Sequence, residues 1–206
     1  MSADAATFRQ GGLHLQCLPN KVPDAFVFAY RAENQSAAPI YVMDAMPQVD
    51  RGTRAVSANP QAAAVILRED GIALVGKFIA PLPQDRILLA PDLPLCTLVQ
   101  PGEAIERELL IPLPFAEASP FFPDLQLRDY AMAEVSAIAF AIGFFVAATP
   151  GLYGAPAAYA PGLHVISPTI APFMAGLALR TLPVKKLEIL KRSDAFPREL
   201  RAHAPG

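Results

Sequence analysis

Apolar and polar residues alternate with a period of two along much of this chain. Leu13, Leu15 and Cys17, for example, are separated by His14 and Gln16. Because successive side chains of a β-strand point to opposite faces of the sheet, this period predicts strands rather than helices. On the same basis we expect strands at residues 26–31, 40–44, 62–68, 72–79, 95–99, 104–111, 163–166 and 176–190, with Pro183 interrupting the last of them.

Short stretches rich in glycine or polar residues separate these strands and indicate turns. Glu69-Asp70-Gly71 predicts a tight hairpin, because Asp-Gly tolerates the positive φ that such turns need. Pro101-Gly102 predicts a second turn, since proline presets the first dihedral and glycine allows the next. The polar residues 33–36 predict a further hairpin that extends over 26–46.

Two polar features interrupt this regular pattern. The stretch 48–60 is polar and is expected to form a surface loop. Arg107 breaks the apolar face of the strand expected at 104–111. We therefore expect Arg107 to lie near the edge of a sheet.

The most apolar segment covers residues 135–149 and carries no charge. Its 15 residues are fewer than the roughly 20 that a membrane-spanning helix needs. Large side chains such as Ile138 and Phe140 alternate with small ones such as Ala139 and Ala141, which favours a strand over a buried helix or a membrane segment. We expect the large face to fill a core. Because a solvated face normally carries polar residues, we expect a loop, a helix or a partner chain to cover the small face.

The composition is that of a globular all-β protein. Hydrophobic residues make up 53% of the 206 residues and charged residues 17%, which excludes intrinsic disorder as the main state. The chain has 22 prolines, and a proline inside a helix costs about 3 kcal/mol. We predict an antiparallel β-sandwich that forms a single domain over residues 1–190, followed by a basic C-terminal tail at 191–206.

Three stretches of the chain resemble a known class of sandwich. Residues 26–34 and 39–44 look like paired strands of immunoglobulin-like or fibronectin type III-like domains, and so does Pro101-Gly102-Glu103 before an alternating strand. The chain departs from true immunoglobulin domains because it contains no tryptophan. The resemblance implies an immunoglobulin-like or fibronectin III-like sandwich to which long proline-rich loops are added.

The loops 81–94, 112–123 and 150–172 are rich in proline and apolar residues. Loops at a protein surface are usually polar, so these must pack against the domain or against another chain. They are expected either to cover the ends of the sandwich or to form a preordered contact surface. Aromatic side chains often dominate protein interfaces. The candidate contact residues are therefore Phe115, Phe121, Phe122, Tyr153 and Tyr159.

Charge is distributed unevenly along the chain. The net charge of −2 and the pI of about 5.9 give no reason to expect nucleic acid, whose binding domains usually have a pI above about 9. Residues 180–206, however, contain seven basic and three acidic residues, which gives this segment a charge of +4. It is expected to be either a solvated strand and tail or a tail that docks on an acidic partner or a membrane surface.

Cys17 and Cys96 are the only cysteines, and both lie among apolar residues. We expect two buried thiols, with a disulfide across the sandwich as the alternative. Residues 1–10 lack the basic start and apolar core of a secretory signal, so no signal peptide and a cytoplasmic location are expected.

Residues that could perform catalysis are sparse. The chain has no Gly-x-Ser-x-Gly, phosphate-loop, His-Glu-x-x-His or Cys-x-x-Cys motif. An enzyme would need His14 or His164 to meet a carboxylate or a cysteine in a cleft. Met43 and Met46 lie near Asp44, and copper(I) prefers soft ligands, but this spacing is more typical of core packing. We predict no catalytic, metal or cofactor site.

The sequence alone identifies no specific activity. The apolar loops and the small face of the 135–148 strand favour a non-enzymatic sandwich that acts through contacts with a protein partner or with itself. The alternative is a protein that binds a small apolar ligand in a pocket between the sheets or under the 150–172 loop.

Overall fold

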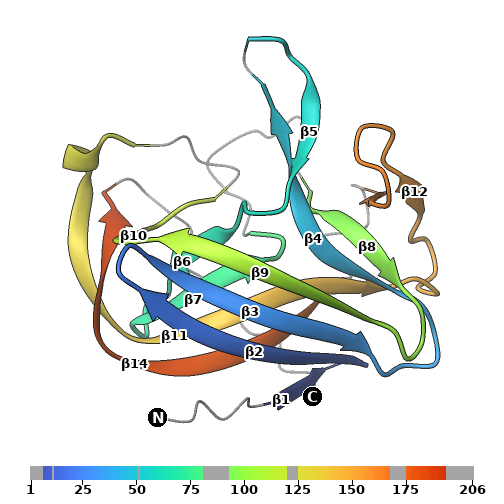
Figure 1. Ribbon diagram of the computed structural model, residues 1–206, viewed down its shortest axis with the longest axis horizontal. Coiled ribbons are helices and arrows are strands. Elements are labelled where there is room, and N and C mark those ends of the chain that lie inside the picture. The colour runs from blue at the N-terminus through green and yellow to red at the C-terminus, as the bar shows by residue number, and fades with distance from the viewer. Residues whose placement is uncertain are drawn as a thin grey trace.

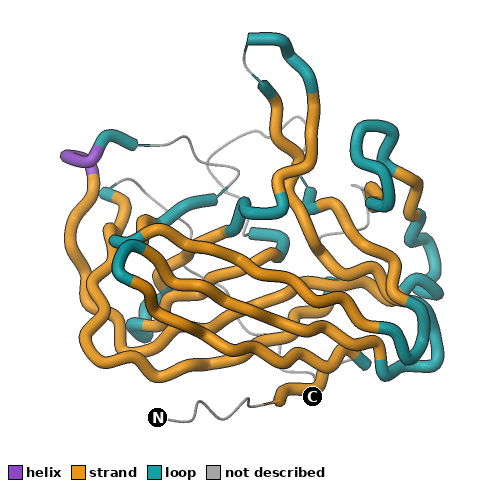
Figure 2. The backbone as a smooth tube through the Cα atoms, viewed as in Figure 1, coloured by secondary structure: helices purple, strands orange, loops and turns teal. Residues whose placement is uncertain are grey.

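The computed structural model describes residues 7–10, 12–50, 52–80, 93–119, 125–167 and 175–193. Within these residues the protein is all-β, with one 3-10 turn, η1 (Leu127–Asp129), and no α-helix (Figures 1 and 2). The first sheet has the strand order β1-β2-β3-β9. Its strands are β1 (Thr7–Gln10), β2 (Leu13–Val22), β3 (Ala25–Asn34) and β9 (Ala104–Pro112).

The second sheet has the order β10-β14-β11-β4-β8-β13-β12, and three further strands join it at its side. The strands on this path are β10 (Phe115–Ala116), β14 (Gly176–Arg192), β11 (Tyr130–Val146), β4 (Ile40–Val49), β8 (Leu95–Val99), β13 (His164–Ile166) and β12 (Gly154–Pro156). β5 (Val56–Asn59) pairs with β4, β7 (Ile72–Lys77) pairs with β11, and β6 (Ala64–Leu67) pairs with β7.

The two sheets pack face to face around an aromatic core. Phe28 of β3 stacks on Phe140 of β11 with ring centroids 5.1 Å apart, and Tyr30 lies 5.2 Å from the same ring. In Figure 1, β2, β3 and β9 cross in front of β7, β11 and β14. Aromatic pairs of this kind contribute about 0.5–1.5 kcal/mol beyond the area they bury. The predicted two-sheet, all-β architecture is confirmed.

The sheets are not purely antiparallel, so that part of the prediction is wrong. β7 runs parallel to β11, with Ala139 opposite Leu74, and β10 runs parallel to β14. The strand order does not show an immunoglobulin-like topology. Alternation along a strand reveals its two faces, but it contains no information about the direction of its neighbours.

The hairpin expected over 26–46 is also wrong, because β3 and β4 belong to different sheets. The Asn34 side chain stabilises the turn at this crossing. Its amide nitrogen donates to the carbonyl oxygens of Ala38 and Val99, each at 2.9 Å, and its amide oxygen accepts from the backbone of Ser36. These bonds tie the 34–38 turn to the end of β8 in the second sheet.

β11 confirms the predicted strand in the apolar segment. Ile138 and Phe140 are fully buried in the main core, as expected for the large face. On the small face, Ala139 and Ala141 are also buried, and they pack in a second cluster that includes Leu74 and Phe78. The segment after β7 therefore covers the small face within a single chain. None of the described residues belongs to a helix that is long and apolar enough to cross a membrane.

Two local expectations are confirmed in detail. Gly71 has a φ of +75° in the turn between β6 and β7, which pair as an antiparallel hairpin. Pro183 lies opposite Ala137, next to the register shift between Val135 and Ala137 that interrupts the β11–β14 ladder. Proline lacks the N–H that a regular ladder requires, which accounts for the irregularity at this point.

Two boundaries differ from expectation. Part of the stretch 48–60 forms a hairpin of β4 and β5, rather than a loop, and this hairpin projects beyond the sandwich (Figure 2). β14 continues to Arg192, whose side chain is buried, so residues 191 and 192 belong to the sheet. The tail from residue 194 onward lies outside the described residues.

Candidate functional site

The predicted contact residues fall into three different environments. Phe115 has no exposed surface, and its ring lies 5.4 Å from that of Phe26 in the core. Tyr153 and Tyr159 are exposed, at 74% and 39% of their surface. Phe121 and Phe122 lie outside the described residues. Tyr153 and Tyr159 are thus the candidates that the structure places on a surface.

The described part of the 150–172 loop packs onto the body of the domain. Leu152, Ala157 and Ala160 are buried, and Leu152 joins a cluster that contains Met43 and Phe145. This agrees with the expectation that the proline-rich loops cover one end of the sandwich. Tyr153 and Tyr159 remain outside, next to the buried residues that anchor the segment.

The β4–β5 hairpin presents a further pair of apolar side chains. Val49 and Val56 lie opposite each other, and 58% and 40% of their surfaces are exposed. Asp50 closes the turn, where its carboxylate accepts hydrogen bonds from the backbone and hydroxyl of Thr53 and from the backbone of Gly52. These bonds, above all the one from the Thr53 backbone, lower the pKa of Asp50.

The hairpin and the 150–167 segment meet at their bases. Ala45 of β4, Leu95 of β8, Ala157 and Ala160 form one buried cluster, against which Ala58 of β5 packs. Two structures that are distant in sequence are therefore held on a common support. We call the exposed apolar side chains that they carry the contact group, which consists of Val49, Val56, Tyr153, Tyr159 and Val165.

A second feature is a charged cluster buried between the two sheets. Asp44 of β4 is almost fully buried, and both of its carboxylate oxygens accept hydrogen bonds from Arg107 of β9, at 2.7 to 3.1 Å. Thr97 of β8 donates a further bond to Asp44 at 2.7 Å. Lys77 of β7 donates to the Asp44 carbonyl oxygen at 2.5 Å and to the Tyr30 hydroxyl at 3.3 Å.

Burial shapes the electrostatics of this cluster. It lowers the pKa of Lys77 to about 8, although Asp44 opposes this effect, and it raises the pKa of the Tyr30 hydroxyl. The hydrogen bonds from Arg107 to Asp44 raise the pKa of Arg107. Since only 1% of Lys77 is exposed, no substrate can reach its amine in this conformation. The cluster joins the sheets, with Asp44, Lys77 and Tyr30 buried and Arg107 partly exposed.

Each histidine considered for catalysis lies near one of the groups named as its partner, His14 near Glu33 and His164 opposite Cys96 of β8, but the two histidines are on different sheets. His14 lies on β2 of the first sheet, with Nδ1 3.3 Å from the Gln35 amide nitrogen and 4.0 Å from a Glu33 carboxylate oxygen. His164 lies on β13 of the second sheet, where its ring packs 5.4 Å from Tyr41. Neither histidine lies in a cleft with the other.

The two cysteines are free and buried, as expected. Burial raises the pKa of the Cys17 thiol to about 12 and raises that of Cys96 further. Both thiols therefore remain protonated near neutral pH. Within the described residues, no group of three or more histidines, cysteines and carboxylates could hold a metal ion.

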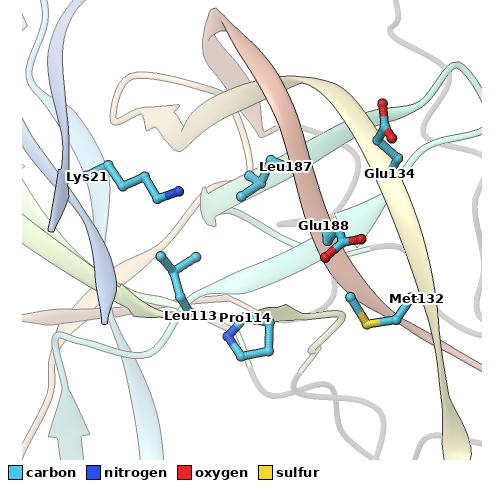
Figure 3. Close-up of a pocket in the computed structure, with 7 residues that line it drawn as sticks. All are labelled: Lys21, Leu113, Pro114, Met132, Glu134, Leu187 and Glu188. Carbon is cyan, nitrogen blue, oxygen red and sulfur yellow. The ribbon is translucent and has the colours of Figure 1, made fainter. Parts of the chain in front are cut away.

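A cavity of about 560 Å³ opens between the sheets at the end where β2 faces β11 and β14 (Figure 3). Lys21 extends toward it from β2, whereas Glu134 of β11 and Glu188 of β14 lie at its rim on the outer face of the second sheet, because they alternate with the buried Val135 and Leu187. Its remaining lining is apolar and consists of Leu113, Pro114, Met132 and Leu187. Glu134 and Glu188 are direct partners in the β11–β14 ladder.

The sequence analysis missed this cavity and the charged cluster. Asp44 and Arg107 are 63 positions apart, and the cavity draws its lining from four separate segments. The one local signal for the charged cluster was Arg107, which interrupts an apolar strand face. Its expected position at the edge of a sheet is confirmed, because β9 is an edge strand of the first sheet.

No protein-family model matches the chain, and no curated protein or solved structure is significantly similar to it.

Proposed function

We propose that this protein is a non-enzymatic interaction module that binds a protein partner through the contact group. The proposal rests on the position of the β4–β5 hairpin and the 150–167 segment. Both carry exposed apolar side chains, and both pack on one buried cluster, which consists of Ala45, Leu95, Ala157 and Ala160. Exposed valine and tyrosine side chains on a rigid base suit a protein interface, because little entropy is lost when they are ordered.

The inaccessibility of the polar cluster also supports this proposal. Lys77 donates to the Asp44 carbonyl oxygen and to the Tyr30 hydroxyl, and all three residues are buried between the sheets. The small face of β11 no longer supports a self-interface, because Ala139 and Ala141 are already covered within the chain. The contact group is therefore the surface on which this proposal rests.

The first experiment is photocrosslinking from two positions in the protein expressed in cells. A photoreactive amino acid replaces Tyr153 in the contact group or, as a control, Glu69 in the β6–β7 turn, which is also exposed. We expect position 153 to form a discrete crosslinked band that position 69 does not form. Light scattering over a concentration series then distinguishes a second copy of this chain from a different partner. Equal labelling from both positions would contradict the proposal.

A second candidate function is ligand binding, and the cavity at Lys21, Glu134 and Glu188 favours it. Its volume of about 560 Å³ lies within the range of about 300–1,000 Å³ that is usual for small-molecule sites. This candidate is the alternative considered from the sequence, a small-ligand binder with a pocket between the sheets. Its three charged side chains indicate that the ligand is not purely apolar.

A further inference from the structure

β9 has one strand as a neighbour and one free edge. It ends the first sheet, where it pairs with β3 (Figure 1). Its nine residues make it long for an edge strand, and proteins usually shorten, charge or cover such edges. In an antiparallel strand the N–H and C=O of one residue point to the same side. The groups that point away from β3 therefore belong to Glu106, Glu108 and Leu110.

Gln61 occupies part of this edge as one residue of a neighbouring strand would. Its side-chain amide donates to the Glu108 carbonyl oxygen at 3.1 Å and accepts from the Leu110 N–H at 3.0 Å. The Gln61 backbone is fixed separately, because its N–H donates to the Asn59 side chain at 2.9 Å. Gln61 is exposed, so its side chain has room to turn into the solvent. The edge thus has the geometry to bind an extended backbone.

The side chains beside this edge form a pattern of charge and apolar surface. Every second residue of β9 points toward the second sheet, so Glu106, Glu108 and Leu110 lie on the outer face of the first sheet. Glu106 pairs with Arg31 at 2.8 Å. Glu108 forms no ion pair with any residue that the structure describes. Leu110 keeps 45% of its surface exposed.

This pattern selects among the strands that can pair with β9. Side chains that lie directly opposite in neighbouring strands are about 4.5–5.5 Å apart, where opposite charges stabilise pairing and like charges oppose it. A lysine or arginine is therefore favoured opposite Glu108, and a carboxylate is disfavoured. Because side chains alternate along a strand, the residue two positions away lies opposite Leu110, where an apolar side chain fits.

We propose that the edge of β9 binds an extended segment of a partner protein as an additional strand, with a basic residue opposite Glu108 and an apolar residue opposite Leu110. The incoming backbone replaces the Gln61 amide and bonds to the Glu108 carbonyl oxygen and the Leu110 N–H. This mode of recognition combines main-chain hydrogen bonds with selection through alternate side chains. The edge is separate from the contact group, so failure of one proposal leaves the other standing.

Fluorescence anisotropy with two labelled peptides tests the proposal on the whole chain. The peptides are Thr-Val-Thr-Lys-Thr-Val-Thr, which presents the same pattern in either strand direction, and its analogue with glutamate in place of lysine. We expect the lysine peptide to bind saturably at or below millimolar concentration and the glutamate peptide to bind about fivefold more weakly. Gln61→Ala should tighten binding of the lysine peptide about fivefold, because the peptide no longer competes with the Gln61 amide.

Charge reversal then tests the pairing at Glu108. Glu108→Lys should invert the preference, so that the glutamate peptide binds more tightly than the lysine peptide. Glu69→Lys makes the same change in the exposed β6–β7 turn and should leave the preference unchanged. The proposal is wrong if the lysine peptide does not bind, if both peptides bind equally, or if Gln61→Ala leaves the affinity unchanged. Dimers of Gln61→Ala without tighter peptide binding would assign the edge to a second copy of this chain instead.

Discussion

Arg107 and Asp44 connect the two sheets through a guanidinium–carboxylate pair. Both nitrogens that Arg107 directs at Asp44 donate to it, and the shortest of these bonds is 2.7 Å long. Removing one partner of a buried pair costs about 3–5 kcal/mol, because the other charge is left without compensation. Arg107 is partly exposed and can regain some hydration, so we expect Asp44→Asn to lower the free energy of unfolding by about 2–4 kcal/mol.

Urea denaturation followed by circular dichroism measures this loss. Asp70→Asn is the matched control, because Asp70 pairs with Arg68 at 2.6 Å on the surface. Exposed ion pairs contribute only about 0–1 kcal/mol. An equal effect of the two substitutions would show that the Asp44–Arg107 pair has no special role in joining the sheets.

The predictable part of this fold is the part that local periodicity determines. The alternation around Ile138 and Phe140 predicts β11, and Asp70-Gly71 predicts the β6–β7 hairpin. Strand pairing depends on contacts that are distant in sequence. The Asn34 amide donates to the Val99 carbonyl oxygen, 65 positions away, at the point where the chain passes from β3 of the first sheet to β4 of the second.

The candidate sites were less predictable for the same reason. Tyr153 was identified because an exposed aromatic residue in an apolar loop is a local signal. Val49 and Val56 were missed because their exposure depends on how far the β4–β5 hairpin extends beyond the sandwich. The cavity was missed because its lining comes from four segments that only the packing of the two sheets brings together.

Lys77 should make the stability of the folded protein depend on pH in the alkaline range. Its folded pKa of about 8 lies below the unfolded value of 10.5, so the unfolded chain binds more protons above pH 8. Lys77 alone should therefore raise stability from pH 8 toward pH 9, by up to about 1.4 kcal/mol per pH unit, and ionisation of the two thiols in the unfolded chain offsets part of this rise. Cys17, Cys96 and Tyr30 have raised pKa values, so the folded chain retains their protons and stability falls above about pH 9.

Urea denaturation at a series of pH values from 7 to 10 tests this expectation. Asp44, Arg107 and the Tyr30 hydroxyl also face the Lys77 amine. Lys77→Met preserves the length of the side chain and should remove the rise between pH 8 and 9. The fall above pH 9 should persist in this variant. A rise that survives in Lys77→Met would assign the titration to another group.

Both cysteines should be inert in the native protein. Cys17 and Cys96 are buried, on β2 and β8, and their raised pKa values leave almost no thiolate at pH 8. We expect modification by a maleimide to be slow in buffer and complete in 6 M guanidinium chloride, as measured by intact mass. Fast labelling of one thiol in buffer would indicate that its strand opens locally, whereas a mass two units too low would indicate a disulfide.

The outer edge of β9 is shielded by a side chain from outside its sheet. The Gln61 amide nitrogen donates to the Glu108 carbonyl oxygen at 3.1 Å, and the Gln61 amide oxygen accepts from the Leu110 N–H at 3.0 Å. Gln61 thus occupies the two backbone groups that a neighbouring strand would use. Exposed strand edges promote association between chains, and proteins commonly block them.

Gln61→Ala should expose this edge. We expect a loss of about 1–2 kcal/mol in the free energy of unfolding, because two hydrogen bonds are removed, and a greater tendency to associate. Light scattering over a concentration series measures the association. Asn20→Ala, an exposed substitution on β2, is the control and should leave the mass unchanged. If Gln61→Ala lowers the free energy of unfolding without increasing association, the Gln61 hydrogen bonds stabilise the fold but do not protect the edge of β9. That result would contradict the protective role proposed for Gln61.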